Sequence, residues 1–154
     1  MKTKIIEQYE AQSAQLRAVI TGLTRADLLA FPIPGTWSIQ QIVIHMSDSD
    51  VIGVDRMKRI IAEEKPLLIG YNETSFSKAL FYDDQSIDNA ITLLELSRSQ
   101  LAIILRKMPD TAWDRIGIHN EIGKVSLGEM LEKYIRHFDH HLGFIAKKRK
   151  LLGK

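Results

Sequence analysis

Apolar side chains recur three and four residues apart in four long stretches of the chain, the spacing that places them on one face of an α-helix. No stretch shows the sustained alternation of apolar and polar residues that is expected of a half-buried strand. The pattern therefore predicts an all-α fold, a four-helix bundle with a long crossover between the second and third helices. The predicted helices cover about residues 2–20, 38–64, 86–107 and 126–150, with a short helical turn at 25–30.

Local signals mark several of the predicted helix ends. Ser38 and Ser126 each stand three residues before a glutamine or glutamate, the spacing of a capping box that satisfies free backbone N–H groups at a helix start. Gly22 stands where a C-terminal cap of the first helix is expected. The proline-rich stretch 31–36 cannot continue a helix, because proline lacks the backbone N–H.

Two connections are longer than a turn between antiparallel helices requires. Residues 65–85, between the second and third helices, are expected to cross one end of the bundle or to cover a site, as a candidate lid. Residues 114–123, after the third helix, could form a short hairpin or an extended loop, but the apolar pattern at Ile116 and Ile118 is too brief to predict a strand. We therefore expect a loop there.

The composition fits a single domain over residues 1–154. The chain is 45% hydrophobic and has a formal net charge of +2 at pH 7, a balance too even to attract nucleic acid. The basic run at 147–150 is expected to stay solvated at the end of the last helix. The longest apolar run, 101–105, is too short to span a membrane, and the N-terminus lacks the apolar region of a secretory signal. We expect a cytoplasmic protein that binds neither nucleic acid nor membrane.

The available metal chemistry centres on histidine. With no cysteine and five histidines, a transition-metal site must use imidazole and carboxylate ligands. His137 and His141 lie four residues apart on the apolar face of the last helix, where two imidazoles can reach one ion. The alternative is a pair of core histidines that hydrogen-bond to other helices. Without a metal, each ring nitrogen left unpaired would cost about 1–3 kcal/mol, which favours a shared ligand.

A third ligand would have to come from another helix. His45 is the only histidine in the first three predicted helices. It lies about 100° from the apolar centre of its helix, on a mixed flank that also carries Asp48, Ser49 and Arg56. Such a flank fits either a wet cavity inside the bundle or ordinary solvent exposure, and the periodicity does not decide between them.

The remaining histidines and the two tryptophans are secondary candidates. His140 is expected at the surface or as a hydrogen-bond partner of a ligand, and His119 could approach the open end of a site. Trp37 and Trp113 are expected to pack at the ends of the core, with stacking on a bound ligand as the alternative for each.

Two signatures resemble the DinB/YfiT-like superfamily. The first lies around the start of the second predicted helix and reads PGTWSIQQ at 34–41 and IHMSDS at 44–49. The second lies around the last helix and comprises GKVSL at 123–127, Tyr134, His137 and HHL at 140–142. In this family the last helix supplies two metal-binding histidines spaced by four, and the first signature supplies the third. The resemblance therefore implies a metal site of His45, His137 and His141.

The resemblance covers most of the chain. Residues 71–73, Trp113 and residues 119–123 are similar to the YfiT-type branch. It implies a four-helix bundle that holds zinc or nickel on three histidines, often as a homodimer, with the chemistry of metal-dependent hydrolases or of S-transferases for low-molecular-weight thiols. Asn120, where a proline is expected, and Phe144, where a polar residue is common, depart from the pattern and suggest a distinct substrate preference at the rim.

An ion on three neutral imidazoles keeps a position for water or substrate, as catalytic zinc sites do. It could lower the pKa of water to about 7 for hydrolysis, or bind a thiol as thiolate. Glu73 and Asp48 are the candidate carboxylates, as a base or as hydrogen-bond partner of a metal-bound imidazole. We predict a metal-dependent enzyme for a small-molecule substrate. The alternatives are a non-catalytic metal or small-ligand binding protein, and a metal-free bundle that acts through dimer contact.

Overall fold

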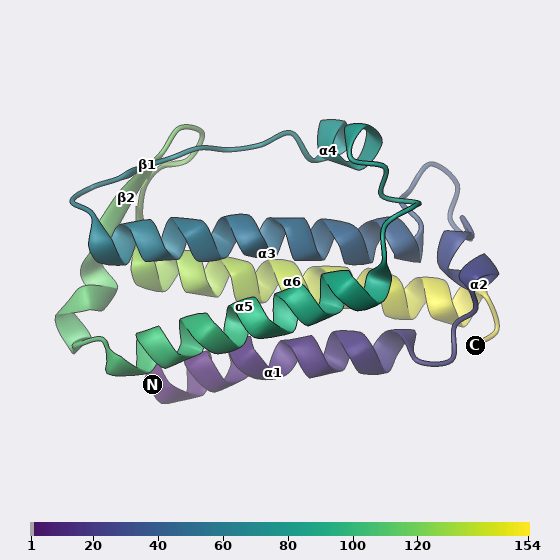
Figure 1. The fold of residues 1–154 in the computed structure, drawn as a ribbon, viewed down its shortest axis with the longest axis horizontal. Coiled ribbons are helices and arrows are strands. Elements are labelled where there is room, and N and C mark those ends of the chain that lie inside the picture. The colour runs from purple at the N-terminus through teal and green to yellow at the C-terminus, as the bar shows by residue number, and fades with distance from the viewer. Residues whose placement is uncertain (1) are drawn as a thin grey trace.

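The computed structural model of the protein describes residues 2–154. Four long helices run side by side in an elongated bundle (Figure 1), which confirms the predicted four-helix bundle. No helix within residues 2–154 combines the length and the apolar character needed to cross a membrane. The helices are α1 (Lys2–Ile20), α2 (Arg25–Leu29), α3 (Ile39–Ala62), α4 (Glu73–Ala79), α5 (Ile87–Lys107), the 3₁₀ helix η1 (Asp110–Asp114) and α6 (Leu127–Leu151), and the strands are β1 (Leu67–Leu68), β2 (Ile116–His119) and β3 (Gly123–Ser126).

Each long helix packs mainly against two of the other three. Both α1 and α3 lie against α5 and α6, so α1 is diagonal to α3 and α5 is diagonal to α6. The apolar faces predicted from the periodicity meet between them, and the core extends along the bundle from Tyr9, Met57 and Met130 to Leu16 and Phe138. The arrangement makes α3 and α6, the helices with the candidate ligands, direct neighbours.

The capping signals place the helix starts where the sequence predicts them. Ser38 and Ser126 each form a complete capping box, in which the serine oxygen accepts from the N–H three residues on and that residue's side chain accepts from the serine N–H. Gly22 has a φ of +80°, a conformation that residues with a Cβ adopt reluctantly, and it follows the end of α1. These ends are predictable because their hydrogen bonds are completed within one turn.

The expectation of a loop between α5 and α6 is wrong. β2 pairs antiparallel with β3 and parallel with β1 from the crossover, in a small three-stranded sheet. The strand alternation is hidden because the buried positions of β2 are Gly117 and His119, whereas Ile118 is 39% exposed. The partner β1 comes from a distant part of the chain, which a short sequence window does not contain.

The long connection between α3 and α5 runs along one side of α3 (Figure 1) and contains β1 and α4. The sequence pattern predicts neither element within it. The side chain of Asn72 accepts from the Ser75 N–H and starts α4. Tyr82, which is 1% exposed, donates its hydroxyl to Asp48 Oδ2 at 2.7 Å and so attaches the connection to α3.

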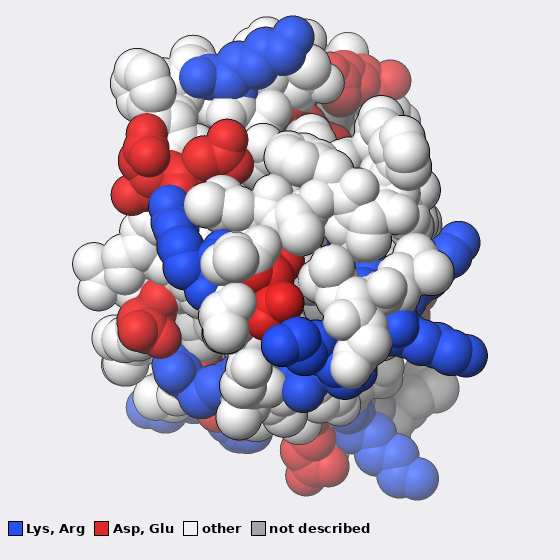
Figure 2. All heavy atoms as spheres, turned by 90° about the vertical axis from the view of Figure 1, so that its right-hand side faces the viewer, with Lys and Arg blue, Asp and Glu red and all other residues white. Residues whose placement is uncertain are grey.

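The basic run at the end of α6 is only partly solvated, contrary to expectation. Lys148 is 1% exposed, and its Nζ donates to Thr36 Oγ1. Arg149 donates to the carbonyls of Val19 and Thr21 at 2.7 and 2.9 Å. These bonds hold the end of α6 against segments distant in sequence, which the charge pattern of α6 cannot reveal. The corresponding end of the molecule shows basic and acidic groups interspersed with neutral ones (Figure 2).

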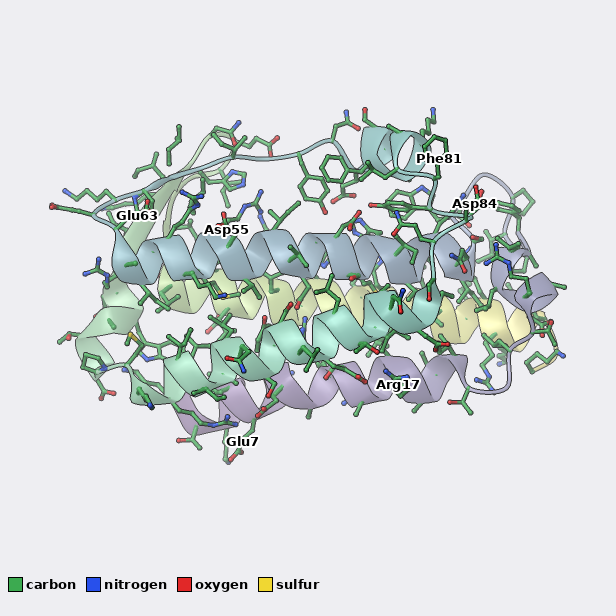
Figure 3. All side chains as sticks on the ribbon, viewed as in Figure 1. Glu7, Arg17, Asp55, Glu63, Phe81 and Asp84 are labelled. Atoms are coloured by element: carbon green, nitrogen blue, oxygen red, sulfur yellow. The ribbon has the colours of Figure 1, made fainter. Side chains whose placement is uncertain are left out.

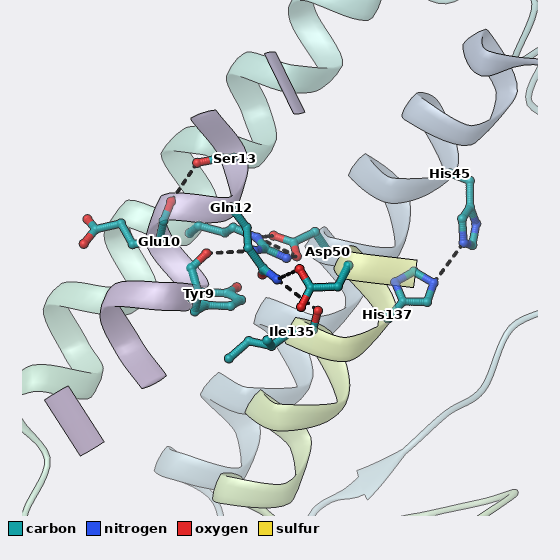
Figure 4. A network of polar contacts seen from close by, with 10 residues as sticks. Tyr9, Glu10, Gln12, Ser13, His45, Asp50, Ile135 and His137 are labelled. Atoms are coloured by element: carbon teal, nitrogen blue, oxygen red, sulfur yellow. Dashed lines mark hydrogen bonds and ion pairs between the residues drawn. The ribbon is translucent and has the colours of Figure 1, made fainter. Parts of the chain in front are cut away.

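A buried ion pair lies at the centre of the bundle (Figure 4). Arg98 of α5 is 1% exposed and Asp50 of α3 is 2% exposed, with Nη2 of the arginine 2.7 Å from Oδ1 of the aspartate. Arg98 Nη1 also donates to the Tyr9 carbonyl at 2.7 Å and to Gln12 Oε1 at 2.8 Å. One guanidinium therefore joins α1, α3 and α5.

The same network extends to α6. The guanidinium carbon of Arg98 lies 4.1 Å from the centre of the Phe138 ring. Gln12 Nε2 donates to the Ile135 carbonyl at 3.0 Å and to Asp139 Oδ1 at 2.6 Å. All three guanidinium nitrogens have partners, which is the condition under which a buried charge is tolerated.

Removal of one partner of this pair should strongly destabilise the fold. Asp50→Ala leaves Arg98 buried without a counter-charge, and we expect the free energy of unfolding to fall by about 3–5 kcal/mol. Glu95→Ala is the matched control, because it breaks a surface pair with Arg17, a residue labelled in Figure 3, where solvent screens the charges. Urea denaturation should show a much smaller loss for the control. Equal losses would contradict a special role of the buried pair.

Candidate metal centre

Two neighbouring helices bring three imidazoles to one point inside the bundle. His137 and His141 lie one turn apart on α6, and His45 faces them from α3. His137 Nε2 lies 3.1 Å from Nε2 of His45 and 3.1 Å from Nε2 of His141; Figure 4 shows the first of these contacts. Within residues 2–154, this is the one group of three or more such side chains whose ligand atoms could share an ion, all within 4.8 Å of one another. The structure thus brings together all three predicted ligands.

The position of His45 settles the alternative that periodicity left open. Its side chain is 0% exposed, so the interpretation of this flank as ordinary solvent-exposed surface is wrong for His45. The flank of α3 that carries it faces α6, and the Trp37 ring covers it at a centroid distance of 4.9 Å. A polar residue on the flank of an amphipathic helix is buried here because a second helix packs on that flank.

Burial keeps the three imidazoles neutral. Burial, and after it the neighbouring histidines, lower the pKa of His45 and of His137 to about 3 and that of His141 to about 4. Each ring therefore has a lone pair to offer at neutral pH, and none of the three rings carries a positive charge that would oppose a cation.

The donor set fits a transition metal that prefers imidazole nitrogen. A neutral imidazole has one N–H, and the Nδ1 atoms of His45 and His141 are buried without a hydrogen-bond partner, so hydrogen bonding alone does not account for the cluster. The two Nε2 spacings of 3.1 Å from His137 are close to the edge of roughly 3.3 Å of a tetrahedron with Zn–N bonds of about 2.0–2.1 Å. Calcium and magnesium prefer oxygen ligands and fit poorly.

The two candidate carboxylates have different surroundings. Asp48 accepts a hydrogen bond from the Tyr82 hydroxyl, and the buried Nδ1 of His45 has no hydrogen-bond partner. The expected hydrogen bond between Asp48 and His45 is therefore absent. One turn of helix separates their Cα atoms, but Asp48 faces the crossover, whereas His45 faces α6. Glu73, exposed at the start of α4, lines the cavity that His137 also lines. A role for either carboxylate as a base stays a prediction.

A cavity of 120 Å³ adjoins the imidazole cluster on the side of His137. Its wall combines α3, the crossover, the small sheet and α6. The helical spacing of His45, Ser49 and Arg56 places its buried arginine on the polar flank of α3, but the sequence pattern assigns that arginine no role. The lining residues are Ser49, Arg56, Gly70, Tyr71, Glu73, His119, Glu121, Lys133, Tyr134 and His137.

A second cavity, of 140 Å³, lies on the side of His141. Its lining includes Trp37, Ile42 and Phe144 and is mainly apolar. The cluster therefore lies between a polar and an apolar cavity. Phe144, one of the departures from the family pattern, contributes to the apolar one, which agrees with its expected place at the rim.

The remaining histidines and the two tryptophans occupy different positions relative to the cluster. His140 is exposed, with its ring centre 5.4 Å from that of His141, which confirms a surface position. His119 is 3% exposed, lines the polar cavity and accepts the Glu121 N–H on Nδ1, but it does not join the cluster. Trp113 packs in the core as expected. Trp37 packs against the core and also contacts His45.

Comparisons with known proteins show the family of this chain. The family model described as the DinB superfamily matches residues 8–145. This chain belongs to the DinB superfamily. A protein of Oceanobacillus iheyensis named "Putative metal-dependent hydrolase" is 28% identical over 147 residues, which cover 94% of this chain and 85% of that protein. The Bacillus subtilis protein YfiT, which has the same descriptive name, is 25% identical over 99% of this chain and 86% of its own length.

Solved structures of related folds extend the comparison. This DinB superfamily chain superposes on B. subtilis YfiT, described as having an unusual four-helix bundle topology, with a TM-score of 0.93 over 99% of this chain and 87% of YfiT. It also matches a mycothiol-dependent maleylpyruvate isomerase with a TM-score of 0.72 over 92% of this chain and 59% of that one. The identity to the isomerase is 14%, so this match concerns the fold alone.

Gly53 sets the position of the tyrosine ring next to the cluster. A Cβ at Gly53 would lie 2.3 Å from the Tyr134 ring, so Gly53→Ala should displace that ring and lower the free energy of unfolding by about 1–3 kcal/mol. Gly143→Ala is the matched control, because a Cβ added at this position of α6 would meet nothing within 4 Å. The control should raise stability by about 0.5–1 kcal/mol through helix propensity. Thermal or urea unfolding measures both changes, and a stabilised Gly53→Ala would contradict the close packing.

Proposed function

We propose that this DinB superfamily chain binds one zinc or nickel ion through Nε2 of His45, His137 and His141 and acts as a metal-dependent enzyme on a small polar substrate. The observation that carries the proposal is the convergence of three neutral imidazole donors, one buried and two half-buried, beside a polar cavity. Zinc and nickel both accept imidazole nitrogen readily. The names of the curated relatives, which refer to metal-dependent hydrolysis, support the same proposal.

Hydrolysis is the first candidate reaction. When bound, the ion supplies a Lewis acid that polarises a substrate oxygen and lowers the pKa of a water or a thiol toward neutrality. The chain holds the substrate in the cavity on the His137 side, which Tyr71 and Tyr134 help to line. Glu73, exposed at the rim of this cavity, is the candidate residue for passing a proton to solvent.

Transfer of a low-molecular-weight thiol to an electrophile is the second candidate. Three neutral ligands leave the double positive charge of the ion uncompensated, which favours an anionic oxygen or sulfur as the next ligand. Both reactions therefore need the same donor set. The rim of the cavity carries a lysine and two glutamates, Lys133, Glu73 and Glu121, a mixture that suits a polar thiol with charges of both signs.

Two further expectations accompany this proposal. A non-catalytic metal or small-ligand binding protein would use the same three ligands, so activity and metal content must be measured separately. The homodimer implied by the family resemblance stays a prediction.

Metal analysis tests the site directly. Protein purified without added metal should contain about one zinc or nickel per chain by mass spectrometric elemental analysis, because three ligands on two rigid helices form a preorganised site. The double variant His137→Ala/His141→Ala should lose it. His140→Ala is the matched control, since it removes an exposed imidazole next to His141, and it should keep the metal. Stoichiometric metal in the double variant would contradict the proposed ligands.

Activity tests separate the two reactions from the binding alternative. We expect the metal-loaded protein to hydrolyse an activated ester or to couple a small thiol to a chloronitrobenzene. Either activity should fall by about 100-fold or more in His45→Ala, because even outer hydrogen-bond partners of metal ligands contribute up to about 100-fold. Chelation should abolish the activity, and zinc or nickel should restore it. Loaded protein that is inactive in both assays would favour the binding protein.

A further inference from the structure

The polar cavity contains a buried positive charge without a counter-charge. Arg56 of α3 is 6% exposed. Its Nη1 donates to the Tyr134 hydroxyl at 3.0 Å and its Nη2 donates to the Ile69 carbonyl, and both acceptors are neutral. No carboxylate in residues 2–154 forms an ion pair with Arg56, and its buried Nε has no hydrogen-bond partner.

The contrast with the other buried arginine is informative. Arg98 is as deeply buried, but a carboxylate and two further oxygens use all of its guanidinium nitrogens. An ionised group in a protein interior is costly unless it is paired and hydrogen-bonded. Arg56 is also buried but has no carboxylate partner, and it lines a cavity instead of a filled core.

A second unused donor lines the same cavity. The Tyr71 hydroxyl is buried near the Ser49 side chain, which lines the same cavity, but it forms no hydrogen bond with good geometry. Burial raises the pKa of Tyr71 to about 12, so the hydroxyl keeps its proton and can donate it to an acceptor. Two orphan donors, one of them on a cation, therefore line one cavity that also reaches His137.

The remaining charged groups around the cavity do not supply the missing anion. Glu73 and Glu121 line it but are exposed, and neither is paired with Arg56. Lys133, also exposed, adds a second positive charge at the rim. The interior of the cavity is therefore cationic, whereas its acidic groups lie toward solvent.

We propose that this cavity binds a carboxylate of the substrate, held by the guanidinium of Arg56 and the hydroxyl of Tyr71. A planar guanidinium matches the geometry of a carboxylate, and such charge-assisted hydrogen bonds are among the strongest available to a protein. The volume of 120 Å³ leaves room for several water molecules, which suits a small acidic group. Only the direction of the rest of the substrate, past His137 toward the imidazole cluster, rests on the proposed function.

Binding of acetate tests the subsite without relying on catalysis. The ¹H–¹⁵N spectrum of the protein, as purified and after removal of metal by chelation, is followed during titration with sodium acetate at constant ionic strength set with sodium chloride. We expect a saturable downfield shift of the Arg56 Nε–H signal, because an orphan N–H gains a charged acceptor. The Tyr71 amide should titrate with the same apparent Kd. The response should be the same in both forms of the protein.

Three variants sharpen the test. Arg56→Gln should weaken acetate binding, followed on the Tyr71 amide, by about ten-fold or more, and Tyr71→Phe should weaken it by a few fold. Arg59→Gln is the matched control, since Arg59 lies nearly one turn further along α3 and pairs with Asp55 on the surface. It should bind acetate within about two-fold of the parent protein, because a surface pair contributes little. Tyr71→Phe keeps the test valid if Arg56→Gln does not fold.

The outcomes distinguish this inference from the proposed function. Absence of a saturable shift, or unchanged acetate affinity in the folded variants of Arg56 and Tyr71, would overturn the carboxylate subsite. Binding that disappears on chelation would also overturn it, because the anion would then lie on the metal. If elemental analysis found no metal but acetate still shifted the Arg56 signal, the subsite would stand and the metal-dependent function would fail.

Discussion

The guanidinium of Arg98 is the contact on which the alignment of all four long helices depends. It pairs with Asp50 on α3, bonds to the backbone and to Gln12 on α1, and stacks on Phe138 of α6. A buried ion pair tolerates little sliding of the helices, because any shift that separates the charges leaves both of them without water or partner. His45 lies five residues before Asp50, and His137 directly precedes Phe138. The same contact that aligns α3 with α6 therefore aligns the imidazoles that face one another between them.

Polar groups in the interior occur in three different hydrogen-bonding environments. Around Arg98 every guanidinium nitrogen has a partner, and the result is a rigid centre. In the histidine cluster, burial makes the rings neutral and leaves lone pairs that converge on one point. At Arg56 the charge is retained and its Nε is unused beside a cavity. Since an unpaired buried donor costs free energy, the last two arrangements are those expected where a cation and an anion are to be received.

Several elements were predictable because their interactions are local. The capping boxes at Ser38 and Ser126 close within one turn, and the apolar stripe of α6 correctly places His137 and His141 on its inner side. The strands escaped prediction because β2 buries a glycine and a histidine and pairs with β1 from the crossover. The charge pattern wrongly places Lys148 in solvent, since its burial against Thr36 depends on a segment over a hundred residues away in the chain.

The sequence by itself determined the four helices, most of their ends, the absence of thiolate ligands and the pair of histidines on α6. These follow from periodicity, capping and composition, which act over one or two turns. The tertiary structure decided the rest. It buries His45 opposite that pair, pairs Asp48 with the Tyr82 hydroxyl instead of with His45, and places Arg56 in the wall of a cavity beside His137. A residue on the flank of an amphipathic helix meets solvent, a cavity or another helix according to which helices pack beside it, and that choice is made by contacts between residues far apart in the chain.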